Sequence, residues 1–138
     1  MIVVDTNVVV HTILGGPHAA MGTAAFARDP EWAAPPLWRS EFANVLATQV
    51  RAGALGHAEA REALSRAEML LAARERPADT AAVLEFAMES GCTAYDCEFV
   101  ALARALGTPL VTNDRQLLKA FPGTAISLTT FATGHPIP

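Results

Sequence analysis

The sequence predicts an α/β layer fold with a parallel sheet, formed by a single domain that spans residues 1–138. Short apolar runs resemble strands that are buried on both faces, as in a parallel sheet. These runs alternate with longer segments of helical periodicity, which is the pattern of α/β proteins. The chain is 51% hydrophobic and 17% charged, which excludes disorder and favours a substantial core.

The first half of the chain is expected to contain two strands and four helices. The run at 1–4 predicts a strand that ends at Asp5. Glycine and proline pairs then mark the ends of successive elements. The expected elements are a helix at 8–14 closed by Gly15-Gly16-Pro17, a helix at 18–28, a strand at 31–34, and helices at 36–51 and 57–71.

The second half is expected to alternate helices with two further strands. The clearest helix lies at 93–106, because its apolar residues form one stripe and Gly107 follows it directly. The other expected elements are a turn or short edge strand at 74–77, helices at 80–89 and 113–120, strands at 109–112 and 125–128, and a closing turn at 130–132.

Charge and cysteine content restrict the functional class. The net charge is −4, with one lysine beside nine arginines, so the basic excess typical of charge-driven nucleic-acid binding is missing. An acidic site loaded with divalent cations can still attract phosphate. Cys92 and Cys97 do not form a CxxC motif, and no export signal or membrane-spanning run is present. We therefore expect a cytoplasmic protein with reduced thiols.

Two aspartates stand directly after predicted strands. Asp5 ends the first strand, and Asp114 follows the strand at 109–112. Ligands of open α/β sheets bind beyond the carboxyl ends of the strands, which makes both residues candidates for a site. Each also fits a structural role, because aspartate is a common helix N-cap and stabilises a first helical turn.

Glu41 falls on the side of its predicted helix that should face the core. It lies four residues after Leu37 and four before Val45, so the three side chains share one helix face. Burying an unpaired carboxylate is costly, so such a group is normally paired, protonated or bound to metal. The structural alternative is a salt bridge to Arg39 or Arg51.

Asp96 repeats this pattern in a later helix. It lies three residues before Phe99 and four before Val100, on the packing stripe. Its structural alternative is a capping box that begins at Thr93.

Together the four acids predict a site for hard divalent cations. Four carboxylates that converge on one crevice cannot all stay ionised without cations, and a ligand set made only of carboxylates points to Mg²⁺ or Mn²⁺. No histidine or cysteine cluster competes, because His11, His18, His57 and His135 are scattered along the sequence. Such ions suit phosphodiester hydrolysis.

Four motifs in this chain resemble those of the PIN domain family, in the family's order. They are Met1-Ile2-Val3-Val4-Asp5-Thr6-Asn7, Arg39-Ser40-Glu41, Ala94-Tyr95-Asp96-Cys97 and Leu110-Val111-Thr112-Asn113-Asp114. The similarity runs from Met1 to about Phe131, and the length is similar to that of VapC-type toxins of toxin–antitoxin pairs. It implies a three-layer α/β/α fold with a five-stranded parallel sheet, and a Mg²⁺- or Mn²⁺-dependent endoribonuclease.

The resemblance also implies a role for each acid. Asp5 and Asp96 would be direct metal ligands, and Glu41 would bind metal or activate the attacking water. Asp114 would complete a second metal position or act through water. Small polar residues would orient these acids, namely Thr6, Asn7, Thr112 and Asn113, the last of which stands where many members carry a small residue.

The resemblance further implies an RNA substrate, a homodimer and a cognate VapB-type antitoxin whose tail occupies the acidic groove. Arg115 and Lys119 follow Asp114 and are candidates for contact with RNA phosphate, although a solvated helix face would also place them there. Glu98 points about 200° away from Asp96 on an ideal helix and is expected at the surface.

Two other functions compete with a nuclease. A non-catalytic PIN-like interaction module would share the fold, but degenerate members usually lose acids of the quartet, and all four are present here. A receiver or a haloacid-dehalogenase-like phosphatase also places an aspartate after its first strand. A receiver requires a second acid beside it and a lysine after a late strand, and the phosphatase usually repeats aspartate two positions on. This chain has Asn7 there, and no lysine precedes Lys119.

Overall fold

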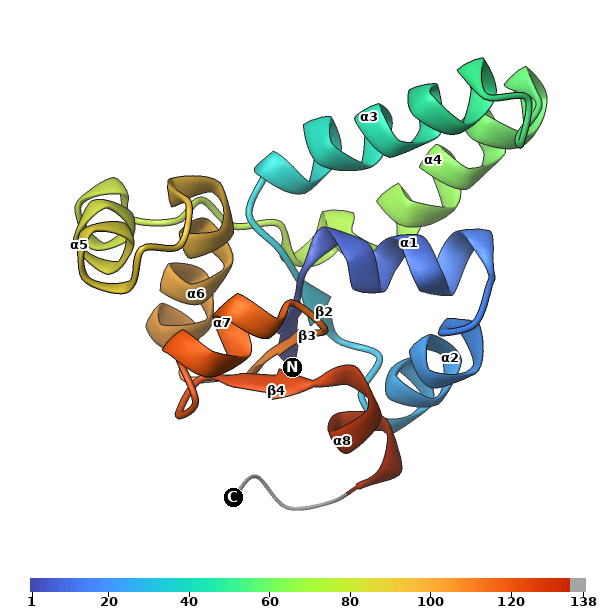
Figure 1. Ribbon diagram of the computed structural model, residues 1–138. Coiled ribbons are helices and arrows are strands. Elements are labelled where there is room, and N and C mark those ends of the chain that lie inside the picture. Colours follow the sequence, from blue (N-terminus) through green and yellow to red (C-terminus); the bar gives the residue numbers. More distant parts are fainter. Residues whose placement is uncertain (135–138) are drawn as a thin grey trace.

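The computed structural model describes residues 1–134 and contains a parallel sheet flanked by helices (Figure 1). The strands are β1 (Ile2–Val4), β2 (Trp32–Ala33), β3 (Leu110–Thr112) and β4 (Ala125–Ser127), arranged in the order β2-β1-β3-β4. Every neighbouring pair is parallel, and Val3 is in register with Ala33 on one side and Leu110 on the other. The predicted α/β fold class is confirmed.

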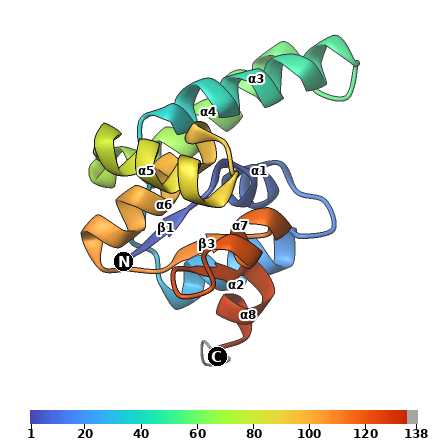
Figure 2. The same cartoon turned by 60° about the vertical axis from the view of Figure 1, so that its left-hand side comes forward.

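Helices cover the sheet from both sides. They are α1 (Thr6–Leu14), α2 (Ala19–Arg28), α3 (Leu37–Arg51), α4 (His57–Leu71), the short 3₁₀ helix η1 (Ala72–Arg74), α5 (Thr80–Ser90), α6 (Ala94–Leu106), α7 (Arg115–Ala120) and α8 (Leu128–Thr133). Figures 1 and 2 show α5 and α6 on one side of the sheet and α1 and α2 on the other, while α3 and α4 form a projecting hairpin. No helix in residues 1–134 is long and apolar enough to cross a membrane.

The two central strands are short and almost entirely apolar, since only Thr112 at the end of β3 is polar. Val3, Val4, Leu110 and Val111 are fully buried, which explains why neither strand alternates polar and apolar residues. The cores of α6 and the sheet are continuous, since Phe99 to Ala103 are all buried. The ends of β1 and β3 are therefore anchored in the core, and this anchoring positions Asp5 and Asp114, which come shortly after them.

The sheet has four strands, so the expectation of five is wrong. The segment that could have formed an edge strand at 74–77 begins inside η1, and its backbone pairs with the chain beside β2 only through an isolated parallel bridge between Glu75 and Ala34. Pro77 follows and has no N–H to extend the ladder.

Most helix boundaries match the expectation to within one residue. Three helices differ by more, and each begins at a side-chain cap. Asp5 caps α1, which begins at Thr6 and not at residue 8. Asp114 caps α7, which begins at Arg115 and not at residue 113. The closing turn expected at 130–132 is part of α8, where the Ser127 hydroxyl accepts from the Thr130 amide at 3.1 Å. Serine, threonine and aspartate favour this role at N-caps.

The cysteines and histidines follow the expectation in part. Cys92 and Cys97 are free and buried. His11 and His18, expected to be scattered, have ring centroids only 4.8 Å apart, and burial followed by the proximity of His18 lowers the pKa of His11. His135 lies outside the described residues.

Candidate active site

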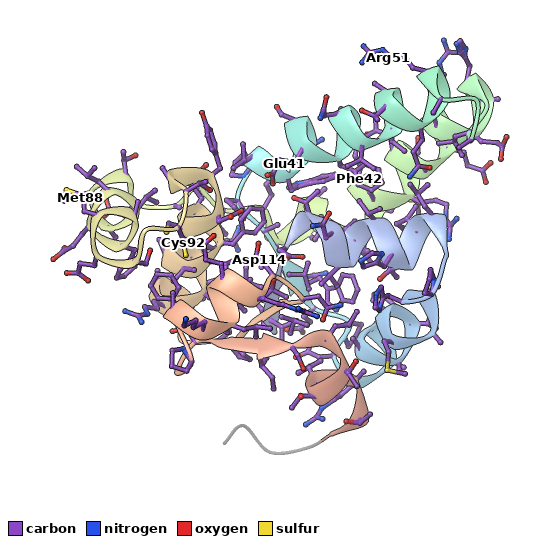
Figure 3. All side chains as sticks on the ribbon, in the orientation of Figure 1. Glu41, Phe42, Arg51, Met88, Cys92 and Asp114 are labelled. Atoms are coloured by element: carbon purple, nitrogen blue, oxygen red, sulfur yellow. The ribbon has the colours of Figure 1, made fainter. Side chains whose placement is uncertain are left out.

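All four predicted acids line one pocket of about 220 Å³ beyond the carboxyl ends of β1 and β3. Figure 3 shows Glu41, which comes from α3, above Asp114 at the start of α7. The complete lining consists of Asp5, Thr6, Asn7, Glu41, Asn44, Val45, Asp96, Phe99 and Asp114. The acids come from four separate segments of the chain, so the tertiary structure alone brings them together.

A buried threonine connects the two strand ends. The Thr112 hydroxyl donates to Asp5 Oδ2 and accepts from the Asp114 amide at 3.0 Å. The other Asp5 oxygen accepts from the Val8 amide at 3.0 Å, and Asp114 Oδ1 accepts from the Leu117 amide at 3.0 Å. Both aspartates are thus helix N-caps that also line the pocket. For each aspartate, the structural role as a helix N-cap is therefore compatible with a place in the candidate site.

Glu41 is held by a residue from the first motif. The Thr6 hydroxyl donates to Glu41 Oε1 at 2.7 Å. Arg39 does not pair with Glu41, because its guanidinium lies 2.9 Å from a Glu68 oxygen and 2.7 Å from a Glu75 oxygen. Glu41 therefore remains available at the pocket, and the salt-bridge alternative with Arg39 does not occur.

Asp96 combines a structural and a pocket role in the same way. Its backbone amide donates to the Thr93 hydroxyl at 3.1 Å, which caps α6. Its carboxylate is half-buried and lines the pocket.

The acids make the pocket strongly negative. Burial raises the pKa of Asp5 to about 6, against the lowering effect of the Thr112 and Val8 hydrogen bonds, and the charges of Asp114 and Asp96 raise it further. Burial also raises the pKa of Glu41 and of Asp96, with added repulsion from neighbouring carboxylates. Within residues 1–134, none of the four acids forms an ion pair with a basic side chain. A compensating cation would relieve this repulsion.

Replacing Thr6 by valine is expected to raise the pKa of Glu41 further. The hydroxyl lowers this pKa by donating to the ionised form, and valine fills a similar volume without a donor. Carboxyl-carbon NMR titration of Glu41 would measure the change. Thr6→Ser keeps the donor and should titrate like the wild type, and a pKa that rises equally in both variants would contradict the assigned hydrogen bond.

The pocket chemistry fits a hard divalent cation. All its charged groups are carboxylates, and Asn7 and Asn44 add amide oxygens without any thiol or imidazole. Within the described part of the chain, no group of three or more Asp, Glu, His or Cys side chains is arranged so that it could hold a metal ion. Mg²⁺ typically uses only one or two carboxylates and keeps several waters. Asp5 and Asp96 would suffice for such an ion.

Several pocket residues were not expected from the sequence. Asn44 and Phe99 line the pocket, and each lies three residues after an acid on the same helix, a spacing that could have revealed them. Glu98, expected at the surface, is half-buried and raises the pKa of Glu41 by its charge. Only the relative placement of α3 and α6 reveals this proximity.

Other predicted residues lie elsewhere. Asn113 does not line the pocket, because its Oδ1 accepts from the Leu128 amide at 3.2 Å and so ties β3 to the start of α8. Arg115 and Lys119 are exposed on α7 and are not part of the pocket lining. Asn7 is at the pocket, as expected, but is exposed.

Comparisons with known proteins agree with this geometry. The family model described as "PIN domain" matches residues 2–122. The crystal structure of PAE2754 from Pyrobaculum aerophilum has a TM-score of 0.77 at 26% identity, covering 96% of this chain and 93% of that one. A toxin–antitoxin complex from Klebsiella pneumoniae has a TM-score of 0.64 at 18% identity, covering 93% and 98%, and this likeness concerns the fold alone. No protein with a curated description matches. The chain belongs to the PIN domain family.

Proposed function

We propose that this protein is a metal-dependent endoribonuclease and the VapC-type toxin of a toxin–antitoxin pair. PIN domains are generally nucleases. The observation that carries the proposal is the convergence of Asp5, Glu41, Asp96 and Asp114 on one pocket. The likeness to a chain from a toxin–antitoxin complex supports the biological context.

The four acids would divide the chemistry of phosphodiester hydrolysis among them. A bound Mg²⁺ or Mn²⁺ ion would activate water and offset charge on the phosphate. Asp5 and Asp96 would hold the ion, and Asp114 would bind a second one or act through water. Glu41 has a raised pKa and receives the Thr6 hydroxyl on Oε1. Its Oε2 is therefore the atom that would take a proton from the attacking water.

The rigid polar contacts around the acids support this assignment. Thr112 orients Asp5 and Thr6 orients Glu41 through direct hydrogen bonds. Such outer partners commonly change activity or metal affinity by about 10–100-fold when they are removed. The fixed strand ends leave these carboxylates little freedom, as catalytic preorganisation requires.

The partners proposed are RNA, a VapB-type antitoxin and a second copy of the chain. Exposed apolar side chains supply candidate protein-binding surfaces: Met69 on α4 is 85% exposed, and Met88 on α5 (Figure 3) is 71% exposed. Arg115 and Lys119 carry exposed charge on α7, beside the Asp114 end of the pocket, and remain candidates for RNA contact.

Purified wild-type protein is expected to cleave members of a pool of structured RNAs when Mg²⁺ or Mn²⁺ is supplied, and EDTA should stop the reaction. Asp96→Asn should abolish cleavage, because the variant loses a carboxylate that the pocket needs for cation binding. Gel analysis of end-labelled RNA fragments would measure both effects.

The matched control is Glu89→Gln, an exposed acid on α5 that is not part of the pocket lining. It should cleave like the wild type. Cleavage that persists in Asp96→Asn or in EDTA would refute the assigned site. No cleavage of any RNA, combined with no shift of the melting temperature by Mn²⁺, would favour the non-catalytic interaction module.

A further inference from the structure

A second pocket, of about 360 Å³, lies at the far end of the α3–α4 hairpin and is bordered by basic side chains. Arg51 is the last residue of α3, His57 is the first of α4, and Arg61 lies one turn further along α4. Together these three residues form what we name the tip cluster. The rest of the lining is apolar, formed by Leu46, Ala47, Val50 and Ala60, and no carboxylate takes part in it.

The arginines of the tip cluster carry charge that the fold does not use. Arg39 is held by two glutamates, and Arg28 and Arg74 donate to backbone carbonyls. The side chains of Arg51 and Arg61 are exposed, and neither has a hydrogen bond or ion pair within residues 1–134. Two unpaired guanidinium groups beside one pocket are well suited to bind anionic oxygens.

A polar track along α3 connects the acidic pocket to the tip cluster. Asn44 lines the acidic pocket, and Thr48 and Arg51 follow it at four and seven residues on the same side of the helix. All three residues are exposed. At 1.5 Å per residue, Arg51 lies about 10 Å beyond Asn44 along the helix axis. Figure 3 shows Glu41 and Arg51 near opposite ends of α3.

We propose that the tip cluster binds the phosphate backbone of single-stranded RNA whose cleaved bond lies in the acidic pocket. This inference rests on the proposed function. The protein carries a net charge of −4 and its pocket is lined by four acids. A divalent ion bound there would attract the phosphate at the cleaved bond, so attraction for the rest of the RNA backbone requires cationic side chains elsewhere. Arg51 and Arg61 supply them, and the His57 ring offers a surface on which a base can stack. An acidic segment of a partner protein is the competing occupant.

The test measures binding without cleavage, in an Asp96→Asn background. Fluorescence anisotropy would compare a uridine dinucleotide, which has a single internal phosphodiester, with an oligouridylate of about 16 nucleotides, each with and without the Arg51→Glu/Arg61→Glu substitutions. The longer RNA should bind about tenfold more weakly to the tip variant, and its log–log salt slope should fall by about 1.4, or roughly 0.7 per lost phosphate contact. The shorter RNA should bind equally to both proteins, because it does not span the track.

The matched control is Arg66→Glu/Arg76→Glu, which changes the net charge equally at two exposed arginines outside the tip cluster. This control should lose less than about twofold in affinity, because neither arginine lines the pocket on which the RNA backbone is proposed to bind. Circular dichroism would establish that every variant is folded.

Equal losses in the control and the tip variant, or an unchanged salt slope in the tip variant, would overturn the proposal. So would a tip variant that loses oligoglutamate binding while it retains RNA binding, since that result would assign the tip cluster to an acidic protein partner. Because the assay requires no hydrolysis, a failure of RNA cleavage by the wild type would refute the proposed function without altering this result.

Discussion

Asp5→Asn is expected to make the fold more stable at neutral pH while it abolishes RNA cleavage. Burial raises the pKa of Asp5 from 3.8 to about 6, so its ionised form is less favourable in the folded state than in the unfolded chain. The difference corresponds to roughly 3 kcal/mol of lost stability at pH 7. The asparagine oxygen can still accept from the Val8 amide, but an NH₂ group replaces Oδ2 and cannot accept from the Thr112 hydroxyl. The lost hydrogen bond offsets part of the gain, so we expect a net gain of about 1–2 kcal/mol.

The raised pKa of Asp5 also predicts how the stability of the wild type changes with pH. Below about pH 4, Asp5 is protonated in both states and costs nothing. As the pH rises through the folded pKa, the unfolded chain has already lost its proton, and wild-type stability declines. The pKa values of Glu41 and Asp96 are also raised, so they add a decline of the same sign to both proteins.

Urea unfolding of wild type and Asp5→Asn between about pH 4 and pH 7 would measure the effect. The stability advantage of the variant should grow across this range. An advantage that is constant with pH would contradict the raised pKa. Asp79→Asn is the matched control, because Asp79 is likewise an N-cap, accepting from the Ala82 amide, but lies away from the pocket.

The Asp5→Asn substitution should lower the rate of RNA cleavage even though it raises the stability of the fold. Asp5→Asn should reduce the rate by at least about 100-fold, because a proposed metal ligand is lost. Mn²⁺ should raise the melting temperature of the wild type through linkage, and it should have little effect on the variant. A variant that is more stable, folded and still active would remove Asp5 from the proposed chemistry.

Trp38→Ala is expected to cause the largest loss of stability, about 3–5 kcal/mol. Trp38 is fully buried near the start of α3 and packs against Phe42 with ring centroids 6.0 Å apart. Its indole N–H donates to Glu75 Oε1 at 2.7 Å. Truncation removes the ring and leaves a cavity between α3 and the segment that carries Glu75. Urea unfolding would measure the loss.

Trp38→Phe separates packing from hydrogen bonding. It keeps an aromatic ring, and Glu75 retains its contact with Arg39 at 2.7 Å, so the expected loss is only about 1–2 kcal/mol. Equal losses in the two Trp38 variants would show that packing does not dominate. Because Glu41 lies one turn from Trp38 on α3, the alanine variant should also weaken Mn²⁺ binding more than the phenylalanine variant does.

The sequence by itself determined the local elements and the candidate acids. Apolar runs that end at polar residues located β1 and β3, and the positions of Glu41 and Asp96 within apolar helix stripes marked them as unusual. These inferences succeed because strand burial and helix periodicity are properties of a few neighbouring residues.

Only the tertiary structure decided which groups share the pocket. Glu98 lies near Glu41 because α3 and α6 border the same pocket, which no spacing within one helix can reveal. Asn113 turns toward Leu128 although it stands between Thr112 and Asp114, since the start of α8 offers it an unpaired amide. The number of strands, the exposed tip cluster and the raised pKa of Asp5 likewise depend on contacts between distant segments. Such contacts are set by the packing of whole elements, and this packing decides burial and charge proximity.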